Sequence, residues 1–167
     1  MGDDIEEMER MLNEYLEFSR HQKSEETERI NLKDLIVSIV NNYENKGVTI
    51  KNGTDYKIDV RPNSIRRCLI NLIDNGLSYG KKVEISTEGS DTKISILVDD
   101  DGPGIPKNEY QNVIKPFYRI DKSRGQNKAG VGLGLSIAND IILSHGGNIS
   151  FDKSPINGLR VKVSLPS

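Results

Sequence analysis

Residues 63–80 read NSIRRCLINLIDNGLSYG, and this stretch decides the fold class. Its apolar residues recur at three- and four-residue spacing, at positions 65, 68, 69, 72, 73 and 76. This pattern predicts a helix that buries one face against a core. Asn71 and Asn75 are four residues apart, so their amides lie one turn apart on the same face. Amide oxygens are ligands that Mg²⁺ accepts, although such a pair on an exposed helix face is more commonly only solvated.

Segments with strand character lie on both sides of this helix. Alternating or apolar runs predict strands at 82–87, 93–99, 148–151 and 160–165. Two further runs, 48–51 and 56–60, flank the sequence NGTD and predict a hairpin. Further helices are expected at 31–45, ended by Gly47, and at about 134–145, ended by Gly146 and Gly147. Helices segregated from a largely antiparallel, mixed sheet predict the α+β class, as a two-layer α/β sandwich.

The first part of the chain has a different pattern. From residue 3 to about residue 22, apolar residues recur every three or four positions along a narrow stripe that includes Ile5, Met8, Leu12 and Leu16. This predicts an amphipathic helix, which needs a second helix or a second copy of the chain to cover its stripe. The charged run KSEETER that follows indicates a linker. The expected division is therefore 1–22 for the helix, 23–30 for the linker and 31–167 for the main domain.

Composition and charge exclude several classes of protein. The 167 residues carry a net charge of −2, from 23 Lys and Arg against 25 Asp and Glu, which offers no general field for a nucleic acid or an anionic membrane. Cys68 is the only cysteine, so neither an intrachain disulfide nor a Cys-based zinc site can form. No apolar run approaches the length of a membrane span. We expect a cytoplasmic chain that is not embedded in a membrane and binds no nucleic acid.

Two glycine-rich stretches indicate a ligand site. In DDDGPGIP, residues 99–106, a strand ends in carboxylates, and Gly102 and Gly104 let the backbone approach a ligand closely. A carboxylate here can accept a hydrogen bond from an exocyclic amine such as adenine N6; a calcium-type loop is the alternative, but no acidic residues follow at EF-hand spacing. In GVGLGL, residues 130–135, three glycines precede a helix whose free N–H groups can meet phosphate oxygens. This second stretch is neither a Walker A sequence nor a dinucleotide-binding GxGxxG motif.

Four stretches in a fixed order resemble a known family. NLIDNGLSYG at 71–80, DDDGPGIP at 99–106, IKPFYRIDKSR at 114–124 and GVGLGL at 130–135 resemble the N, G1, F and G2 boxes of the catalytic ATP-binding domain of bacterial sensor histidine kinases. That domain shares a superfamily with gyrase-type, Hsp90-type and MutL-type ATPases. The resemblance covers about residues 30–167 and implies a Bergerat-type fold with a long ATP lid at 105–130. Residues 4–20 look like the second helix of the kinases' dimerisation and histidine-phosphotransfer hairpin.

The resemblance also implies roles for individual residues. Asn75 matches the family's magnesium-ligating asparagine, Asn71 its partner in metal binding and catalysis, and Asp100 the adenine-reading aspartate. Arg119 matches the catalytic lid arginine near the γ-phosphate. The other residues expected to bind ATP are Tyr79 beside the base, Gly102, Gly104, Lys122, Gly130, Gly132, Leu133 and Gly134. Further lid cations expected near the phosphates are Lys115, Arg124 and Lys128. The chain departs from the family at Ser78, where many members have a phosphate-contacting Lys or Arg, and at Ile114 and Val131.

The function implied is that of the donor half of a protein-histidine kinase, with ATP and Mg²⁺ as cofactors. The γ-phosphoryl would pass to a histidine and from there to a response regulator. Neither His21 nor His145 is followed by the acid expected of the acceptor, which would therefore lie upstream of residue 1. The N-terminal helix would form a homodimer in the full-length protein, and the chain would be the cytoplasmic part of a bacterial inner-membrane sensor.

Two other functions remain open from the sequence. A related ATP hydrolase or clamp needs a carboxylate that activates water where this chain has the amide of Asn71. Asp74 is acidic, but it lies three-quarters of a turn away from Asn71 and is not expected to replace it. A degenerate nucleotide-binding or dimerisation module would agree with Ser78 and with the missing acceptor. Direct nucleotide titration separates this module from the kinase and the hydrolase, and steady-state phosphate release then separates the kinase from the hydrolase.

Overall fold

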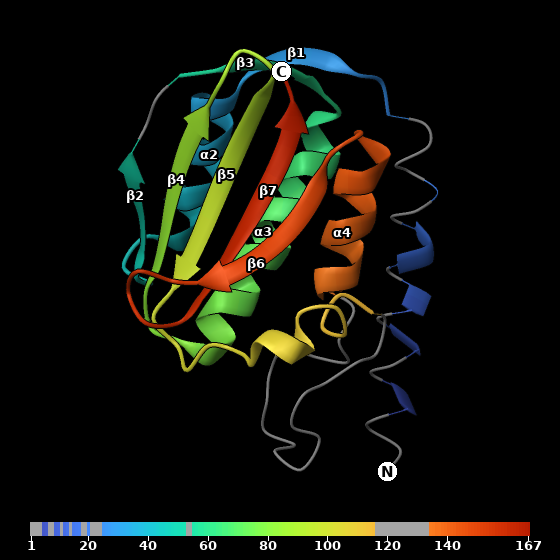
Figure 1. Ribbon diagram of the computed structural model, residues 1–167. Coiled ribbons are helices and arrows are strands. Elements are labelled where there is room, and N and C mark those ends of the chain that lie inside the picture. Colours follow the sequence, from blue (N-terminus) through green and yellow to red (C-terminus); the bar gives the residue numbers. More distant parts are fainter. Residues whose placement is uncertain are drawn as a thin grey trace.

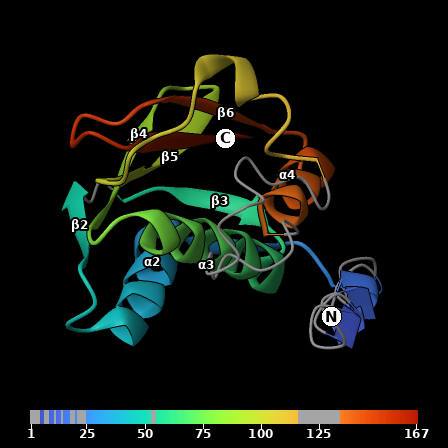
Figure 2. The same cartoon turned by 90° about the horizontal axis from the view of Figure 1, so that it is seen from below.

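The structure of the protein is a computed structural model, and it describes residues 5–6, 9–10, 12–13, 15–17, 20, 25–52, 55–115 and 134–167. Its main part has two layers (Figure 1). One layer is a five-stranded sheet, and three helices cover one face of it, as the view from below in Figure 2 shows. The predicted α+β sandwich is confirmed.

The strands of the large sheet have the order β2-β4-β5-β7-β6. Their bounds are Val48–Asn52 for β2, Val83–Gly89 for β4, Lys93–Asp100 for β5, Asn148–Lys153 for β6 and Leu159–Pro166 for β7. Strands β2 and β4 are parallel, whereas the other three pairs are antiparallel. The sheet is therefore mixed, as expected.

The helix layer consists of α2 (Leu32–Val40), α3 (Pro62–Tyr79) and α4 (Gly134–Ser144). Helix α3 buries Ile65, Cys68, Leu69, Leu72, Ile73 and Gly76, which is the set that the three- and four-residue spacing predicts. This face meets the inward-facing Val, Ile and Leu residues of the sheet in one continuous core. Asn31 caps α2 as expected, because its side chain accepts a hydrogen bond from the Asp34 N–H at 3.1 Å. Two short 3₁₀ turns are also present, η1 (Asn41–Tyr43) and η2 (Lys107–Glu109).

The predicted hairpin at 48–60 is wrong. Strand β2 pairs with β4 instead, and β3 (Lys57–Val60) pairs antiparallel with β1 (Glu28–Asn31) in a separate two-stranded sheet. A parallel pair needs a crossover connection, and β3 together with α3 supplies it between β2 and β4. After β2 the chain therefore leaves the large sheet, whereas a hairpin would have placed β3 next to β2 in that sheet.

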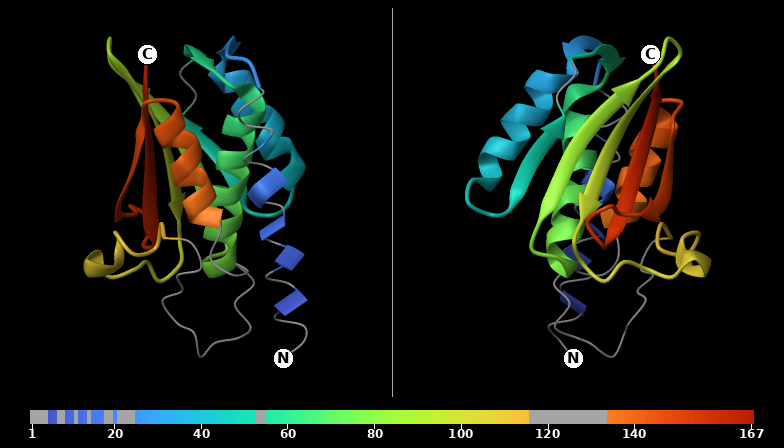
Figure 3. Two further views of the ribbon diagram at one scale, coloured as in Figure 1. Left: turned by 90° about the vertical axis from the view of Figure 1, so that its right-hand side faces the viewer. Right: turned by 60° about the vertical axis from the view of Figure 1, so that its left-hand side comes forward.

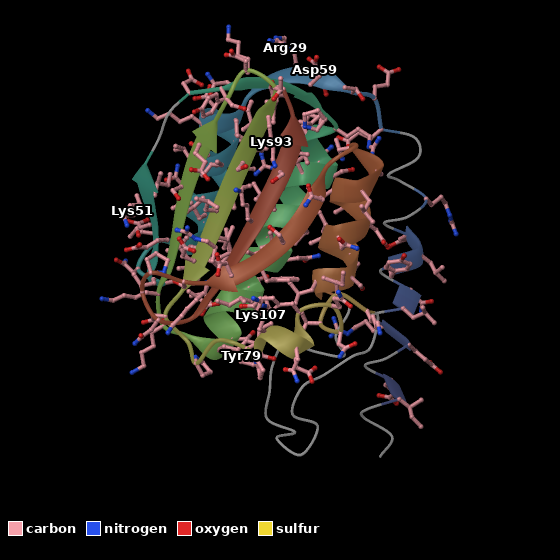
Figure 4. The ribbon with its side chains drawn as sticks, in the orientation of Figure 1. Arg29, Lys51, Asp59, Tyr79, Lys93 and Lys107 are labelled. Carbon is pink, nitrogen blue, oxygen red and sulfur yellow. The ribbon has the colours of Figure 1, made fainter. Side chains whose placement is uncertain are left out.

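Strand β1 also revises the expected linker, since it begins at Glu28, within the charged run at 23–29. Ile30 lies opposite Ile58, whose side chain is buried in the core. At the next position of the paired strands β1 and β3, Arg29 and Asp59 form a solvent-exposed ion pair with an N–O distance of 3.3 Å (Figure 4). The end of this run is thus part of the folded domain.

The described residues between 5 and 20 lie alongside α4, on the side of the helix layer away from the sheet (Figure 3). The Tyr15 hydroxyl donates a hydrogen bond of 2.7 Å to Asp140 of α4. Ile5, Leu12 and Leu16 are exposed. In the described part of the chain, no helix combines the length and the apolar character that a bilayer crossing requires.

Candidate nucleotide-binding site

Helix α3 carries three of the predicted site residues at four-residue intervals: Asn71, Asn75 and Tyr79. The Asn71 amide donates to the Gly134 carbonyl, with an N–O distance of 3.3 Å, at the start of α4. Because a carbonyl can only accept, this contact fixes the amide nitrogen toward α4 and leaves the side-chain oxygen available. The donor set of two amide oxygens suits Mg²⁺, which prefers oxygen ligands.

Asp74 lies on another side of α3. Its carboxylate accepts a 2.7 Å hydrogen bond from the Tyr43 hydroxyl. Burial and this contact raise the pKa of Tyr43, so the tyrosine stays protonated and remains a donor. The Ser78 hydroxyl donates back to the Asp74 carbonyl at 2.9 Å. The Asp74 carboxylate therefore has a partner in η1, and the Ser78 hydroxyl is bonded within its own helix.

Asp100 ends β5 as a carboxylate that is only 5% exposed. Its Oδ1 accepts hydrogen bonds from the Gly102 N–H at 2.9 Å and the Leu159 N–H at 3.1 Å. Burial raises the pKa of Asp100, and these two hydrogen bonds oppose the rise by stabilising the charged form. Its Oδ2 lies toward α3, 3.7 Å from the place where a side chain at Gly76 would begin.

Two glycines make room for this carboxylate. A Cβ at Gly158 would overlap Oδ1 of Asp100, and a Cβ at Gly76 would lie 3.3 Å from the Asp100 Cβ and 2.9 Å from Val83. Gly76 was predicted only as part of the buried face. The role of Gly158 was not predicted, because the turn that precedes β7 carries no sign that it folds back onto Asp100.

The turn after β5 is also close to α3. Gly104 has a positive φ of 74°, which glycine adopts without strain. A Cβ at Gly102 would lie 2.8 Å from the Tyr79 carbonyl oxygen. The sequence predicts that both glycines admit a ligand, but the space at Gly102 is needed by the backbone of α3. Tyr79 itself is 45% exposed, at the same end of the molecule as Lys107 (Figure 4).

The carboxylate before Asp100 has a structural partner. Asp99 points to the opposite face of β5, where Arg160 of β7 donates to both of its oxygens at 2.7 and 2.9 Å. Asp99 is nearly inaccessible to solvent, and this pairing raises the pKa of Arg160. Of the three consecutive aspartates, only Asp100 therefore faces the helix layer from the end of β5.

Three close approaches connect predicted residues of this region: Asn71 with Gly134, Asp100 with Gly76 of the buried face of α3, and Tyr79 with Gly102. Of the predicted lid cations, Lys115 is described, and its ammonium group donates to the Asn112 side-chain oxygen at 3.0 Å. The other predicted lid and glycine-turn residues lie outside the described residues: Arg119, Lys122, Arg124, Lys128, Gly130, Gly132 and Leu133. In the part of the chain that is described, no three His, Cys, Asp or Glu side chains form a metal cluster, and the candidate metal ligands are amides instead.

Comparisons with known proteins place this arrangement in a family. Residues 60–167 match the family described as histidine kinase-, DNA gyrase B- and HSP90-like ATPases. Sensor histidine kinase GtrS of Pseudomonas aeruginosa is 34% identical over 167 residues, which cover 99% of this chain and 34% of that protein. Sensor protein RstB of Escherichia coli is 32% identical over 174 residues, which cover 98% of this chain and 40% of that protein. The chain therefore spans about a third to two fifths of the length of these relatives.

Solved structures of histidine kinase domains also match the fold of this chain. The catalytic domain of histidine kinase ThkA matches with a TM-score of 0.73 and 27% identity, over 84% of this chain and 97% of that one. The histidine kinase domain of the E. coli osmosensor EnvZ matches with a TM-score of 0.64 and 26% identity, over 83% of this chain and 88% of that one. The chain described here therefore belongs to the family of histidine kinase-, DNA gyrase B- and HSP90-like ATPases, and its relatives within that family are sensor histidine kinases.

Proposed function

We propose that this chain is the ATP-binding catalytic part of a sensor protein-histidine kinase that uses Mg²⁺. The observation that carries the proposal is the buried carboxylate of Asp100 at the end of β5. Its Oδ1 is taken by two backbone N–H groups, while Oδ2 lies toward α3. A carboxylate held in this way offers one acceptor in a fixed direction, which suits the exocyclic amine of adenine.

The other residues have consistent roles in this proposal. Asn75 and Asn71 hold Mg²⁺ through their amide oxygens, and Tyr79 lies beside the base. The ion supplies neutralisation of phosphate charge when it is bound. Gly102, Gly104, Arg119, Lys122, Gly130, Gly132, Leu133 and Gly134 remain predicted ATP contacts. An imidazole nitrogen of the acceptor histidine then forms a bond to the γ-phosphorus, the bond to the β,γ-bridging oxygen breaks, and ADP leaves with that electron pair.

His145 is a poor candidate for the acceptor. Its Nε2 lies 3.1 Å from the Arg61 N–H, which donates to it, and its Nδ1 lies 2.7 Å from the Ile141 carbonyl oxygen. Both ring nitrogens are therefore engaged, and neither can attack a phosphorus atom without breaking a contact. His21 lies outside the described residues. We expect the acceptor on a preceding helix, with phosphoryl relay to a response regulator.

The exposed apolar residues Ile5, Leu12 and Leu16 support a homodimer through the N-terminal helix of the full-length protein. They are 43–61% exposed, whereas Tyr15 on the same segment contacts α4. We propose a cytoplasmic location for this part of a bacterial inner-membrane sensor, because its relatives are sensor proteins. A hydrolase is less consistent, because Asn71 is an amide and cannot accept a proton from water.

The direct test is the substitution Asp100→Asn with ATP and GTP as ligands. Two backbone N–H groups occupy Oδ1, so an asparagine must place its carbonyl there and present its NH₂ group to the ligand. That NH₂ opposes the adenine amine but can donate to the guanine carbonyl. We expect Mg-ATP affinity to fall by about 1.5–3 kcal/mol, while Mg-GTP loses much less.

Isothermal titration of both nucleotides against the wild type and the variant measures this effect. The same titrations in EDTA report the metal dependence, and Asn75→Ala should remove most of the gain that Mg²⁺ provides. Equal loss for ATP and GTP in the Asp100 variant would contradict base reading by this carboxylate. Absence of any Mg-ATP binding by the wild-type chain would contradict the proposed function itself.

A further inference from the structure

The segment that leaves α3 and the turn that follows β5 are tied together by one carboxylate. Oδ1 of Asp101 accepts the N–H of Lys81 at 2.7 Å and the N–H of Lys82 at 2.9 Å. The N–H of Asp101 donates in return to the Lys82 carbonyl at 3.2 Å. Three hydrogen bonds therefore join these two segments, which are separated by the whole β4–β5 hairpin in the sequence.

The packing between the two segments depends on their glycines. A Cβ at Gly80 would lie 2.5 Å from Asp101 Oδ1 and 2.8 Å from the Gly102 nitrogen. A Cβ at Gly102 would lie 2.8 Å from the carbonyl oxygen of Tyr79. Each glycine thus leaves room for the backbone or carboxylate of the other segment. The contact requires glycine at both positions, since a methyl group at either one would force the segments apart.

The residues just before this contact are the proposed ligands of the nucleotide. Tyr79 precedes Gly80 on one side, and Asp100 precedes Asp101 on the other. We propose that Asp101 is a positioning residue of the ATP site, which holds the Tyr79 end of α3 against the turn that Asp100 begins. This inference rests on the proposed function, because it assigns Asp101 a role through Asp100 and Tyr79.

The charge of Asp101 has its own effect. The N–H groups of Lys82 and Lys81 lower the pKa of Asp101, so its carboxylate is ionised at neutral pH. A negative charge near a triphosphate could also repel it, or ligate Mg²⁺. These roles depend on charge, whereas the positioning role depends only on an acceptor oxygen at Oδ1. Asparagine keeps that oxygen and removes the charge, so the two kinds of role can be separated.

The test compares Asp101→Ala with Asp101→Asn by calorimetric titration of Mg-ATP. If Asp101 positions the site, the alanine variant binds at least about fivefold more weakly, the factor that one ordinary hydrogen bond represents. The asparagine variant should bind within about twofold of the wild type. Asp91→Ala is the matched control, because it removes an exposed aspartate from the opposite end of the same β4–β5 hairpin.

Gly80→Ala provides an independent second variant. It leaves the Asp101 carboxylate in the chain but displaces it, so Mg-ATP binding should weaken as it does in Asp101→Ala. Circular dichroism at the titration temperature verifies that each variant is folded, and Gly80→Ala replaces Asp101→Ala in the comparison if the latter is not.

Three results would overturn the inference. Equal weakening in Asp101→Ala and Asp101→Asn would assign a charge-dependent or metal-binding role. Tighter binding in both would assign repulsion, and unchanged binding in both Asp101→Ala and Gly80→Ala would leave Asp101 no role in the site. Each of these results requires that the wild type binds Mg-ATP, so they are distinguishable from failure of the proposed function.

Discussion

Each end of α3 is bonded to a carboxylate from another segment, but the two carboxylates connect the helix to different regions of the molecule. At the N-terminal end, Glu25 accepts the Asn63 N–H at 2.8 Å, the Ser64 N–H at 3.1 Å and the Ser64 hydroxyl at 3.0 Å. At the C-terminal end, Asp101 accepts two N–H groups just beyond the helix. One contact joins the segment before β1 to α3, and the other joins α3 to the candidate site.

The N-terminal contact makes up for a missing cap. Helix α3 starts with Pro62, and its N-cap residue Arg61 makes no capping hydrogen bond with its side chain. Glu25 supplies the acceptor instead, and a carboxylate is favourable at the positive end of a helix. His145 accepts the remaining N–H of Arg61. This end is therefore satisfied entirely by protein groups.

The C-terminal end differs because it leaves Tyr79 partly exposed, next to the turn after β5 that contains Gly102. From this difference we expect substitutions at the N-terminal end to change stability while nucleotide affinity stays constant. Substitutions at the C-terminal end should change affinity as well. The following three predictions test that division, beginning with the largest expected effect.

Gly102→Ala should have the largest effect, because its Cβ would lie 2.8 Å from the Tyr79 carbonyl oxygen. Relief of that overlap requires α3 and the turn to move apart, so we expect unfolding in urea to require about 1–3 kcal/mol less free energy. Mg-ATP affinity should fall in the fraction that remains folded. A variant with wild-type stability and affinity would show that this contact is not tight.

Glu25→Ala should have an intermediate effect, confined to stability. Loss of the cap should lower the free energy of unfolding by about 1 kcal/mol, while the Mg-ATP dissociation constant of the folded protein stays within error of the wild type. Urea unfolding and calorimetric titration measure the two quantities. Glu26→Ala, at the exposed neighbouring position, is the control and should leave both unchanged.

The smallest effect concerns the pH dependence of stability at His145. Burial lowers the pKa of His145 below its ordinary 6.5, Arg61 acts in the same direction, and the Ile141 carbonyl and Glu25 oppose it. Below about pH 6.5 the unfolded chain therefore binds a proton that the folded chain does not, and the free energy of unfolding falls as the pH falls toward the lowered pKa.

Urea unfolding at several pH values between about 7.5 and 5.5 measures this slope. In His145→Gln the group that titrates is gone, so the fall over this range should be smaller than in the wild type. Equal slopes in the two proteins would mean that His145 gains no proton preferentially on unfolding.

The periodicity of α3 was a sufficient guide to its structure, because a helix and its buried face are local features of the sequence. The Asn31 cap was predictable for the same reason, since it involves a residue only three positions away. The choice of strand partners is not local. The residues between β2 and β3 are compatible with a hairpin, whereas the actual pairs, β1 with β3 and β2 with β4, join segments that are far apart in the sequence.

The candidate site also contains both residues that the sequence indicates and residues that it does not. Motifs indicate Asn71, Asn75 and Asp100, because these side chains offer ligand chemistry directly. They do not indicate Glu25, Asp101 or Gly158, whose contacts join residues that lie far apart in the sequence. Gly102 was expected to admit a ligand, but its closest constraint is Tyr79. A glycine in a motif shows that space is needed without showing what occupies it.

The parallel pairing of β2 with β4 has a consequence for the order in which the protein folds. Residues 53–82, which include β3 and α3, lie between the two strands, so β2 has no partner until that whole crossover has been made. Closing such a loop costs entropy before the pairing compensates it, and the antiparallel β4–β5 hairpin needs only a short turn. In pulsed hydrogen exchange during refolding, amides of β4 and β5 should therefore become protected before those of β2.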